Sequence, residues 1–163
     1  MKKRKEQSTQ PQAQAIGTDE MMPILRESIA AGGSVTIPVR GVSMLPILKE
    51  GRDSVILSPI EKDLRKRDIV LYQRADDSYI LHRIARLGES YTCIGDAQFV
   101  FEKGIAPSQM IAVVTAIRRG AREIRVTNPF YRLCAALWCA SRPLRYFAKR
   151  VKRKLCRMLG IKK

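Results

Sequence analysis

The sequence lacks any run of about 18–20 apolar residues, which is the length that a helix needs to cross a bilayer. It also lacks an apolar segment after its basic start, MKKRKEQSTQPQAQA, so this start does not have the pattern of a secretory signal. We interpret residues 1–17 as a disordered polar and basic arm. Both absences favour a protein that stays in the cytoplasm.

Residues that bind metals or form disulfides are also scarce. The chain has one histidine, His82, and four cysteines, none of them in a C-x-x-C pair. Zinc sites and disulfide frameworks require paired thiols at characteristic spacings or thiols with histidine partners. We therefore expect no metal and no cofactor, and cysteines that are reduced and partly buried.

Acidic residues are missing from one end of the chain. Residues 128–163 contain 11 Lys and Arg and no Asp or Glu, whereas the first 127 residues hold 20 basic and all 15 acidic residues. The formal net charge of the whole chain is +16. A positive charge concentrated in this way favours a polyanionic partner, either a nucleic acid or an anionic membrane surface.

Short segments with a period of two make up the middle of the chain. Seven stretches rich in Val, Ile and Tyr have the pattern of β-strands: 34–40, 53–59, 68–74, 79–87, 90–96, 110–117 and 122–126. Residues 18–33 precede them and predict a helix, with acids in its first turn and two glycines at its end. We therefore predict a mainly β domain over residues 18–127, antiparallel and folded over to protect its edges, with an N-terminal helix.

Beyond the last predicted strand the pattern becomes helical. Asn128 can cap a helix and Pro129 suits its first turn, after which apolar residues recur at helical spacing. Pro143 interrupts this pattern, which then resumes. From Leu144 to Leu159 an apolar stripe lies opposite a face of Lys and Arg. We predict a basic amphipathic helical tail over residues 128–163.

Two uses of this tail stay open. It can lie on the inner face of an anionic membrane as a peripheral helix, where Trp138, Tyr146 and Phe147 are residue types that favour the headgroup boundary. Alternatively, its apolar stripe packs on the sheet of the same protein or on a partner. We expect no specific nucleic acid, because no helix-turn-helix pattern precedes the strands and a basic tail alone binds without specificity.

Ser43 and His82 are the residues best suited to chemistry. A serine hydroxyl needs a base to remove its proton, and a histidine can do this near pH 7 once a carboxylate fixes its tautomer. Asp96 ends the strand that follows His82, so a hairpin would bring it back toward the histidine, and Glu102 is the other possible acid. Each residue alone also has a purely structural interpretation, because serines are common in Gly/Pro turns and single histidines in cores.

Taken in order, the segments GVSMLPIL, EGRDSVIL, LRKRDIVLYQ, YILHRI and IGDAQ resemble the S24/S26 serine peptidases. This family includes signal peptidases and self-cleaving repressors, and the resemblance covers residues 34–126. It implies the peptidase fold, with Ser43 as the nucleophile and His82 as the base, as in the histidine-using signal peptidases. The acid of that subgroup falls within or just after the Gly-Asp motif, so we expect Asp96 first and Glu102 second.

The resemblance also implies a substrate site, with contacts at Met44 and Pro46. Gly41 lies two residues before Ser43 and offers no hydroxyl for an oxyanion hole, so backbone N–H groups, including that of Ser43, must bind the oxyanion. The expected function is a serine endopeptidase that cleaves a peptide or protein precursor held against a strand edge. The alternative is a catalytically inactive peptide-binding module of the same fold, docked through its basic tail.

Overall fold

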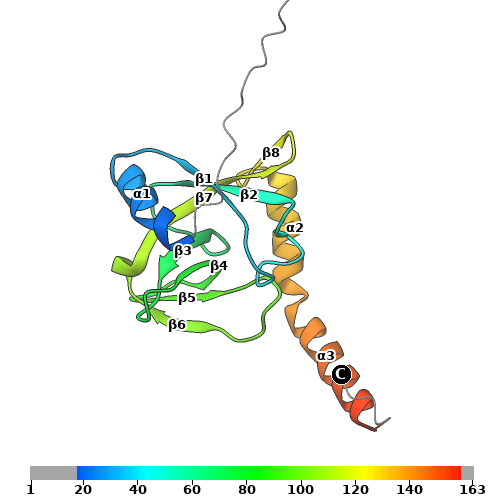
Figure 1. Cartoon of the computed structure of the whole chain (residues 1–163). Coiled ribbons are helices and arrows are strands. Elements are labelled where there is room, and N and C mark those ends of the chain that lie inside the picture. Colours follow the sequence, from blue (N-terminus) through cyan, green and yellow to red (C-terminus); the bar gives the residue numbers. More distant parts are fainter. Residues whose placement is uncertain (1–17, 159–163) are drawn as a thin grey trace, which may run out of the picture.

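The computed structural model describes residues 18–158, which form one antiparallel β sheet with a helix before it and two helices after it (Figure 1). Helix α1 is Thr18–Ala30, and the strands are β1 Val35–Pro38, β2 Asp53–Ser58, β3 Ile69–Gln73, β4 Tyr79–Arg86, β5 Tyr91–Ile94, β6 Glu102–Ile105, β7 Met110–Arg119 and β8 Arg122–Arg125. Helices α2 (Pro129–Ala140) and α3 (Arg142–Met158) follow. The predicted mainly β fold with an N-terminal helix and a helical tail is confirmed; the predicted arm, 1–17, lies outside the described residues.

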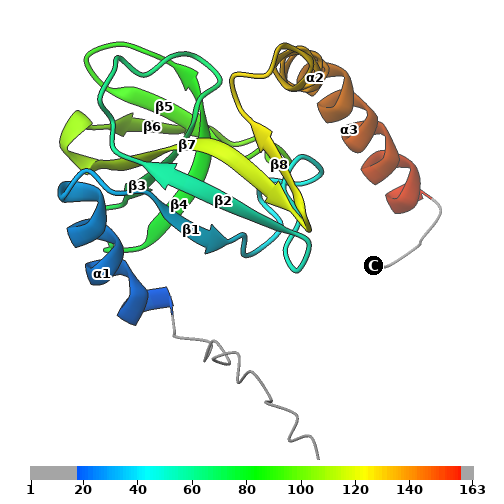
Figure 2. The same ribbon diagram turned by 90° about the horizontal axis from the view of Figure 1, so that it is seen from above.

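The strands are arranged in the order β1-β2-β7-β3-β4-β5-β6, with β8 pairing with the far end of β7. Among the described strands, β1 pairs with β2 alone, so its other edge is open. The sheet curls, and α1 lies on one side of it while α2 and α3 lie on the other, as the two perpendicular views agree (Figures 1 and 2). Within this part of the chain, no helix is both long and apolar enough to cross a membrane.

Strand β6 is the one described strand that the sequence pattern did not predict. Its residues, EKGI, contain two charges and a glycine, and they show no alternation of apolar and polar side chains. It forms because its backbone completes the ladder beyond β5, with Cys93 opposite Glu102. The missed strand therefore carries one of the two acids considered for the site.

The sheet has an apolar cluster on each face. Alternate residues of β3 face opposite sides, so Leu71 belongs to one cluster while Val70 and Tyr72 belong to the other. Helix α1 covers the first cluster with Met22 and Leu25, which are almost fully buried. His82 pairs with Val70 in the ladder and therefore faces the second cluster.

Helix α2 begins where the sequence predicts. The Asn128 Oδ1 accepts the N–H groups of Phe130 and Tyr131 at 2.9 and 3.2 Å. The helical tail is interrupted at Ser141, between α2 and α3, and Pro143 lies within the first turn of α3. The interruption thus precedes the proline by two residues, because proline is well tolerated in a first helical turn.

The segment between β1 and β2, which contains Ser43, is held in place by Asp53. This carboxylate is 3% exposed and accepts the Lys49 N–H at 2.9 Å and the guanidinium groups of Arg52 and Arg119 at 2.7 and 2.8 Å. Burial by itself raises the pKa of Asp53, but these donors outweigh it and lower the pKa to about 2.

Asp53 should therefore make stability depend on pH at the acid end. Because its folded pKa lies below the ordinary 3.8, its contribution is present above about pH 4 and is lost as the pH falls toward 2. This shift corresponds to about 2 kcal/mol. Urea denaturation of wild type and Asp53→Asn at about pH 6 and pH 2 should show that the wild type loses about 2 kcal/mol more. Equal losses in the two proteins would contradict this assignment.

Candidate functional site

The hairpin of β4 and β5 decides which acid faces His82. Arg83 lies opposite Ile94 and Ile84 opposite Cys93. Residues opposite each other in an antiparallel pair share a face, and successive residues alternate between faces. The Arg83 face therefore continues to Asp96, whereas His82 lies on the other face. The prediction that Asp96 is the acid beside His82 is corrected: the hairpin forms, but its alternation points this carboxylate away from the histidine.

Asp96 instead forms a buried ion pair with Arg83. The Arg83 Nε and Nη2 donate to the two oxygens of Asp96 at 2.8 and 2.7 Å, and Nη1 donates to the carbonyl of Arg67 at 2.8 Å. Both residues are at most 2% exposed. Burial by itself lowers the pKa of Arg83, but Asp96 outweighs it and raises the pKa. The Gly-Asp motif thus has a structural task here.

Glu102, the second acid considered, is the one that lies at His82. Because Glu102 is opposite Cys93, it shares the face of the histidine, and its Oε1 is 3.3 Å from His82 Nδ1. Tyr72 donates its hydroxyl to Glu102 Oε2 at 2.6 Å and lies 3.4 Å from the same Nδ1. Arg74 pairs with the same carboxylate. Tyr72 and Arg74 were not among the predicted site residues, although period-two alternation on β3 places Tyr72 on the Val70 face.

The charges at this cluster favour a neutral imidazole beside an ionised carboxylate. Burial lowers the pKa of His82; Glu102 opposes this effect and Arg74 adds to it. Burial by itself raises the pKa of Glu102, but the hydrogen bonds from Arg74 and Tyr72 outweigh it and lower the pKa. A carboxylate at Nδ1 favours the tautomer that carries its proton there. His82 Nε2 is then the acceptor, and among residues 18–158 no hydrogen bond occupies it.

Ser43 lies in the turn after β1, next to the turn that follows β5. Its carbonyl accepts the Ala97 N–H at 2.8 Å. This close approach requires a glycine at position 95, since a Cβ there would lie 2.6 Å from the Ser43 oxygen. Arg83 opposite Ile94 is the last pair of the β4–β5 ladder, and Gly95 follows Ile94 where the ladder ends. The Ser43 turn thus lies at the end of β5, the strand that pairs with the strand of His82.

The side chains of Ser43 and His82 are not hydrogen-bonded to each other. No hydrogen bond within the described chain involves the Ser43 Oγ or the Ser43 N–H. The N–H is therefore free to donate to an oxyanion. Pro46 is exposed in the same turn, but Met44 is 2% exposed and packs in the first apolar cluster. The prediction of a substrate contact at Met44 is corrected, because its helical-type turn points the side chain into the core.

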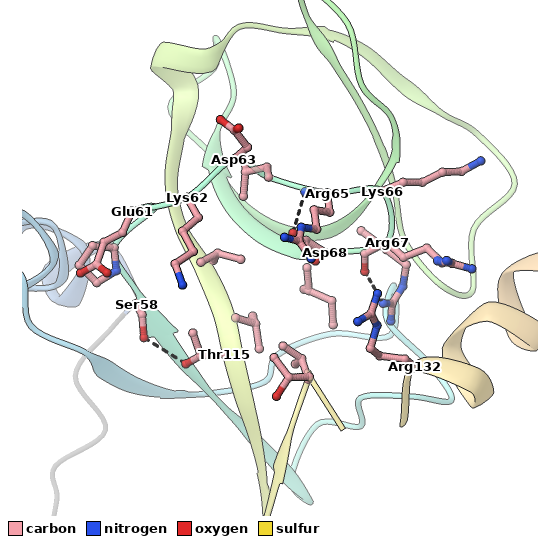
Figure 3. Close-up of a pocket in the computed structure, with 18 of the residues that line it drawn as sticks. Ser58, Glu61, Lys62, Asp63, Arg65, Lys66, Arg67, Asp68, Thr115 and Arg132 are labelled. Atoms are coloured by element: carbon pink, nitrogen blue, oxygen red, sulfur yellow. Dashed lines mark hydrogen bonds between the residues drawn. The ribbon is translucent and has the colours of Figure 1, made fainter. Parts of the chain in front are cut away.

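A cavity of about 590 Å³ lies apart from these residues (Figure 3). It is lined by the 59–68 loop, β7 and the start of α2, and Arg83 borders it. Lys62 reaches into it, while Lys66 extends away. Neither member of the serine–histidine pair lines it. Across residues 18–158, no group of three or more His, Cys, Asp or Glu is arranged to hold a metal ion.

Comparisons of this chain with protein-family models, with curated proteins and with solved structures gave no match. The functional interpretation therefore depends on the motifs of the sequence and on the geometry around Ser43, His82 and Glu102.

Because His82 is the single histidine of the chain, its titration can be followed by NMR without ambiguity. We expect a pKa below 6.5, since burial is the largest effect on it. Glu102→Gln should lower that pKa further, because the carboxylate favours the charged imidazole. Glu123→Gln makes the same chemical change at an exposed position on β8 and should leave the pKa of His82 unchanged. A higher pKa of His82 in the Glu102→Gln variant than in wild type would contradict this electrostatic assignment.

Proposed function

We propose that this protein is a serine endopeptidase of the S24/S26 type, with Ser43 as the nucleophile, His82 as the general base and Glu102 as the acid that orients it. The observation that carries the proposal is the contact of 3.3 Å between Nδ1 of the buried His82 and the partly exposed Glu102. A histidine that only fills a core has no need of an ionised carboxylate held by two further side chains. The free Nε2 and the nearby serine turn give that arrangement a catalytic use.

The proposed reaction follows from these atoms. Nε2 of neutral His82 accepts the Ser43 proton as Oγ bonds to the scissile carbonyl carbon, and the Ser43 N–H stabilises the resulting oxyanion. The imidazolium, stabilised by Glu102, then gives its proton to the leaving amine as the C–N bond breaks. A water molecule then bonds to the acyl carbon as His82 accepts its proton, and the imidazolium gives that proton to Ser43 Oγ as the ester bond breaks and the acyl group leaves as a carboxylic acid. Catalytic hydrogen bonds are often long in free enzymes, and here Ser43 and His82 must come together when substrate binds.

The open edge of β1 supports an extended peptide as the substrate. This strand leads directly into the turn of Ser43, and its outer edge is unpaired among the described strands. A peptide added along Val35–Pro38 would pair with the backbone and carry its scissile bond toward Ser43. Pro46 is exposed beside this path. A processing peptidase for a peptide or protein precursor is consistent with such a site.

One observation favours a second function. The missing hydrogen bond between Ser43 and His82 is what an inactive peptide-binding module of the same fold would show, because such a module needs no proton transfer. It would keep the β1 edge and the Gly95 turn while His82 and Glu102 served only as a buried polar pair.

A serine-reactive fluorophosphonate probe distinguishes these functions. The wild type should be labelled at Ser43, and Ser43→Ala and His82→Ala should lose labelling. Glu102→Gln should label about 10²–10⁴-fold more slowly, because the tautomer and the imidazolium lose their support. The rate for wild type should rise with pH to a plateau through a midpoint below 6.5, the direction in which burial moves the pKa of His82. If wild type is not labelled, or if His82→Ala is labelled as fast as wild type, the peptidase proposal fails and the peptide-binding module is the function that remains.

The tail supports attachment to an anionic membrane surface. An apolar stripe runs along the outer side of α2 and α3, and its members are between 48% and 75% exposed: Phe130, Leu133, Leu137, Leu144, Phe147, Val151 and Leu155. The stripe does not pack on the protein's own sheet. Eight of the 17 residues of α3 are Lys or Arg, and each basic residue near an anionic surface contributes about 1 kcal/mol. We infer a peripheral position on the inner face of such a membrane.

Trp138 is an exception to the predicted headgroup residues. Its indole turns toward the body, where Nε1 donates to the carbonyl of Asp96 at 3.1 Å. The reason is its helical position: one turn after the buried Ala135, it lies on the inner side of α2. Tyr146 also lies against the body, with its ring centre 5.5 Å from that of Phe99, whereas Phe147 remains on the outer side.

Co-sedimentation with phosphatidylglycerol vesicles tests the membrane proposal. Wild type should bind at low salt and dissociate as salt rises. Replacing Leu144, Phe147 and Val151 with Ser keeps every charge but should weaken binding about tenfold or more, because apolar burial is lost. Ile24→Ser removes an exposed apolar side chain from α1 and is the matched control. Equal binding by the triple variant, or no binding at low salt, would contradict this position.

A further inference from the structure

The peptide unit between Asp96 and Ala97 connects the C-terminal helices to the Ser43 turn. Its carbonyl accepts the Trp138 Nε1–H at 3.1 Å and an Arg145 Nη1–H at 3.2 Å. Its N–H, on Ala97, donates to the Ser43 carbonyl at 2.8 Å. A peptide unit is planar and rigid, so its two ends cannot move independently. The position of the helices is therefore transmitted to the backbone of Ser43 through one peptide plane.

The two donors on the helix side are themselves held together. The Arg145 guanidinium lies 3.7 Å from the centre of the Trp138 ring. It also donates to the Trp138 carbonyl at 2.9 Å and to the Ser141 hydroxyl at 3.1 Å. These contacts bridge the interruption between α2 and α3 at Ser141. The guanidinium thus has a defined place because it joins both helices.

Further contacts hold the same helices against the segment that follows Ala97. The rings of Phe99 and Tyr146 have centres 5.5 Å apart, and the Lys149 ammonium lies 5.1 Å from the Phe99 ring. Arg142 lies 5.8 Å from the ring of Phe101. Beyond these contacts α3 extends away from the sheet (Figure 1).

We propose that Trp138 and Arg145 are positioning residues that hold the Ser43 turn through the Asp96–Ala97 peptide unit. A cationic donor on the carbonyl polarises the peptide and strengthens its N–H as a donor to Ser43. Loss of both donors frees the peptide plane to rotate, so the Ser43 turn is no longer held where Oγ can reach His82 Nε2 when substrate binds. The Arg83–Asp96 pair still anchors the turn, so the fold remains. The catalytic part of this inference rests on the proposed peptidase function.

Hydrogen exchange at the Ala97 amide tests this role without any assay of activity. Trp138→Phe keeps an aromatic ring and Arg145→Met keeps a long side chain, but each removes the donor. The double variant should exchange the Ala97 amide about tenfold faster or more, while amides between β2 and β7 keep the wild-type rate. With Lys in place of Met at position 145 of the double variant, a cationic donor is present again, and part of the protection of the Ala97 amide should return. Arg122→Met removes a guanidinium from an exposed position on β8 and is the control, so its Ala97 amide should exchange at the wild-type rate.

Labelling of Ser43 by the fluorophosphonate probe is the second measurement. The maximal rate for the double variant should fall about 10–100-fold, with little change in the probe concentration that gives half the maximal rate. Unchanged exchange at Ala97 would overturn the proposal, and so would faster exchange with labelling as rapid as in wild type. If wild type itself is not labelled, the peptidase proposal fails, while faster exchange in the double variant still supports the hold on the Ser43 turn.

Discussion

The buried ion pair between Arg83 and Asp96 sets the conformation of the chain after β5. Removing either partner would leave a charge out of water, at a cost of about 3–5 kcal/mol. The pair is stable because two hydrogen bonds join it and a third, to the Arg67 carbonyl, satisfies the remaining side of the guanidinium. Because Arg83 holds the Asp96 side chain, the Asp96–Ala97 peptide unit has one defined orientation. The Ser43 turn and the C-terminal helices both bind to that backbone.

Two carboxylates that are close in sequence have different tasks because they meet different cations. Asp96 is fully buried and both of its oxygens bind Arg83, so its role is structural. Glu102 keeps 23% of its side chain exposed, and Arg74 contacts both of its oxygens. Tyr72 donates to Oε2, whereas Oε1 also faces His82. Burial also raises the pKa of neighbouring Cys93 to about 12, which keeps this thiol protonated beside the carboxylate. The environment of each acid, and not its distance along the chain, decides its role.

The C-terminal helices have two unlike sides. Their inner side contributes an indole N–H and a guanidinium to a single peptide carbonyl, and these polar contacts are effective because they are partly shielded from water. Their outer side exposes an apolar stripe over the length of α2 and α3. A surface that binds the outer side therefore acts on the same helices that hold the Asp96–Ala97 peptide unit.

Local pattern in the sequence was enough to predict the mainly β fold, α1, the start of α2 at Asn128 and the amphipathic tail, because alternation and capping act over a few residues. Residue chemistry alone was enough to single out Ser43 and His82 as a possible pair. Tertiary structure determines which carboxylate lies beside His82, because strand register places Asp96 on one face and Glu102 on the other. A register shift of one residue would exchange them. Strand β6 forms only because β5 offers a ladder to it. The direction of Trp138 likewise depends on what α2 packs against, because helical periodicity defines a face but does not say which face meets the sheet.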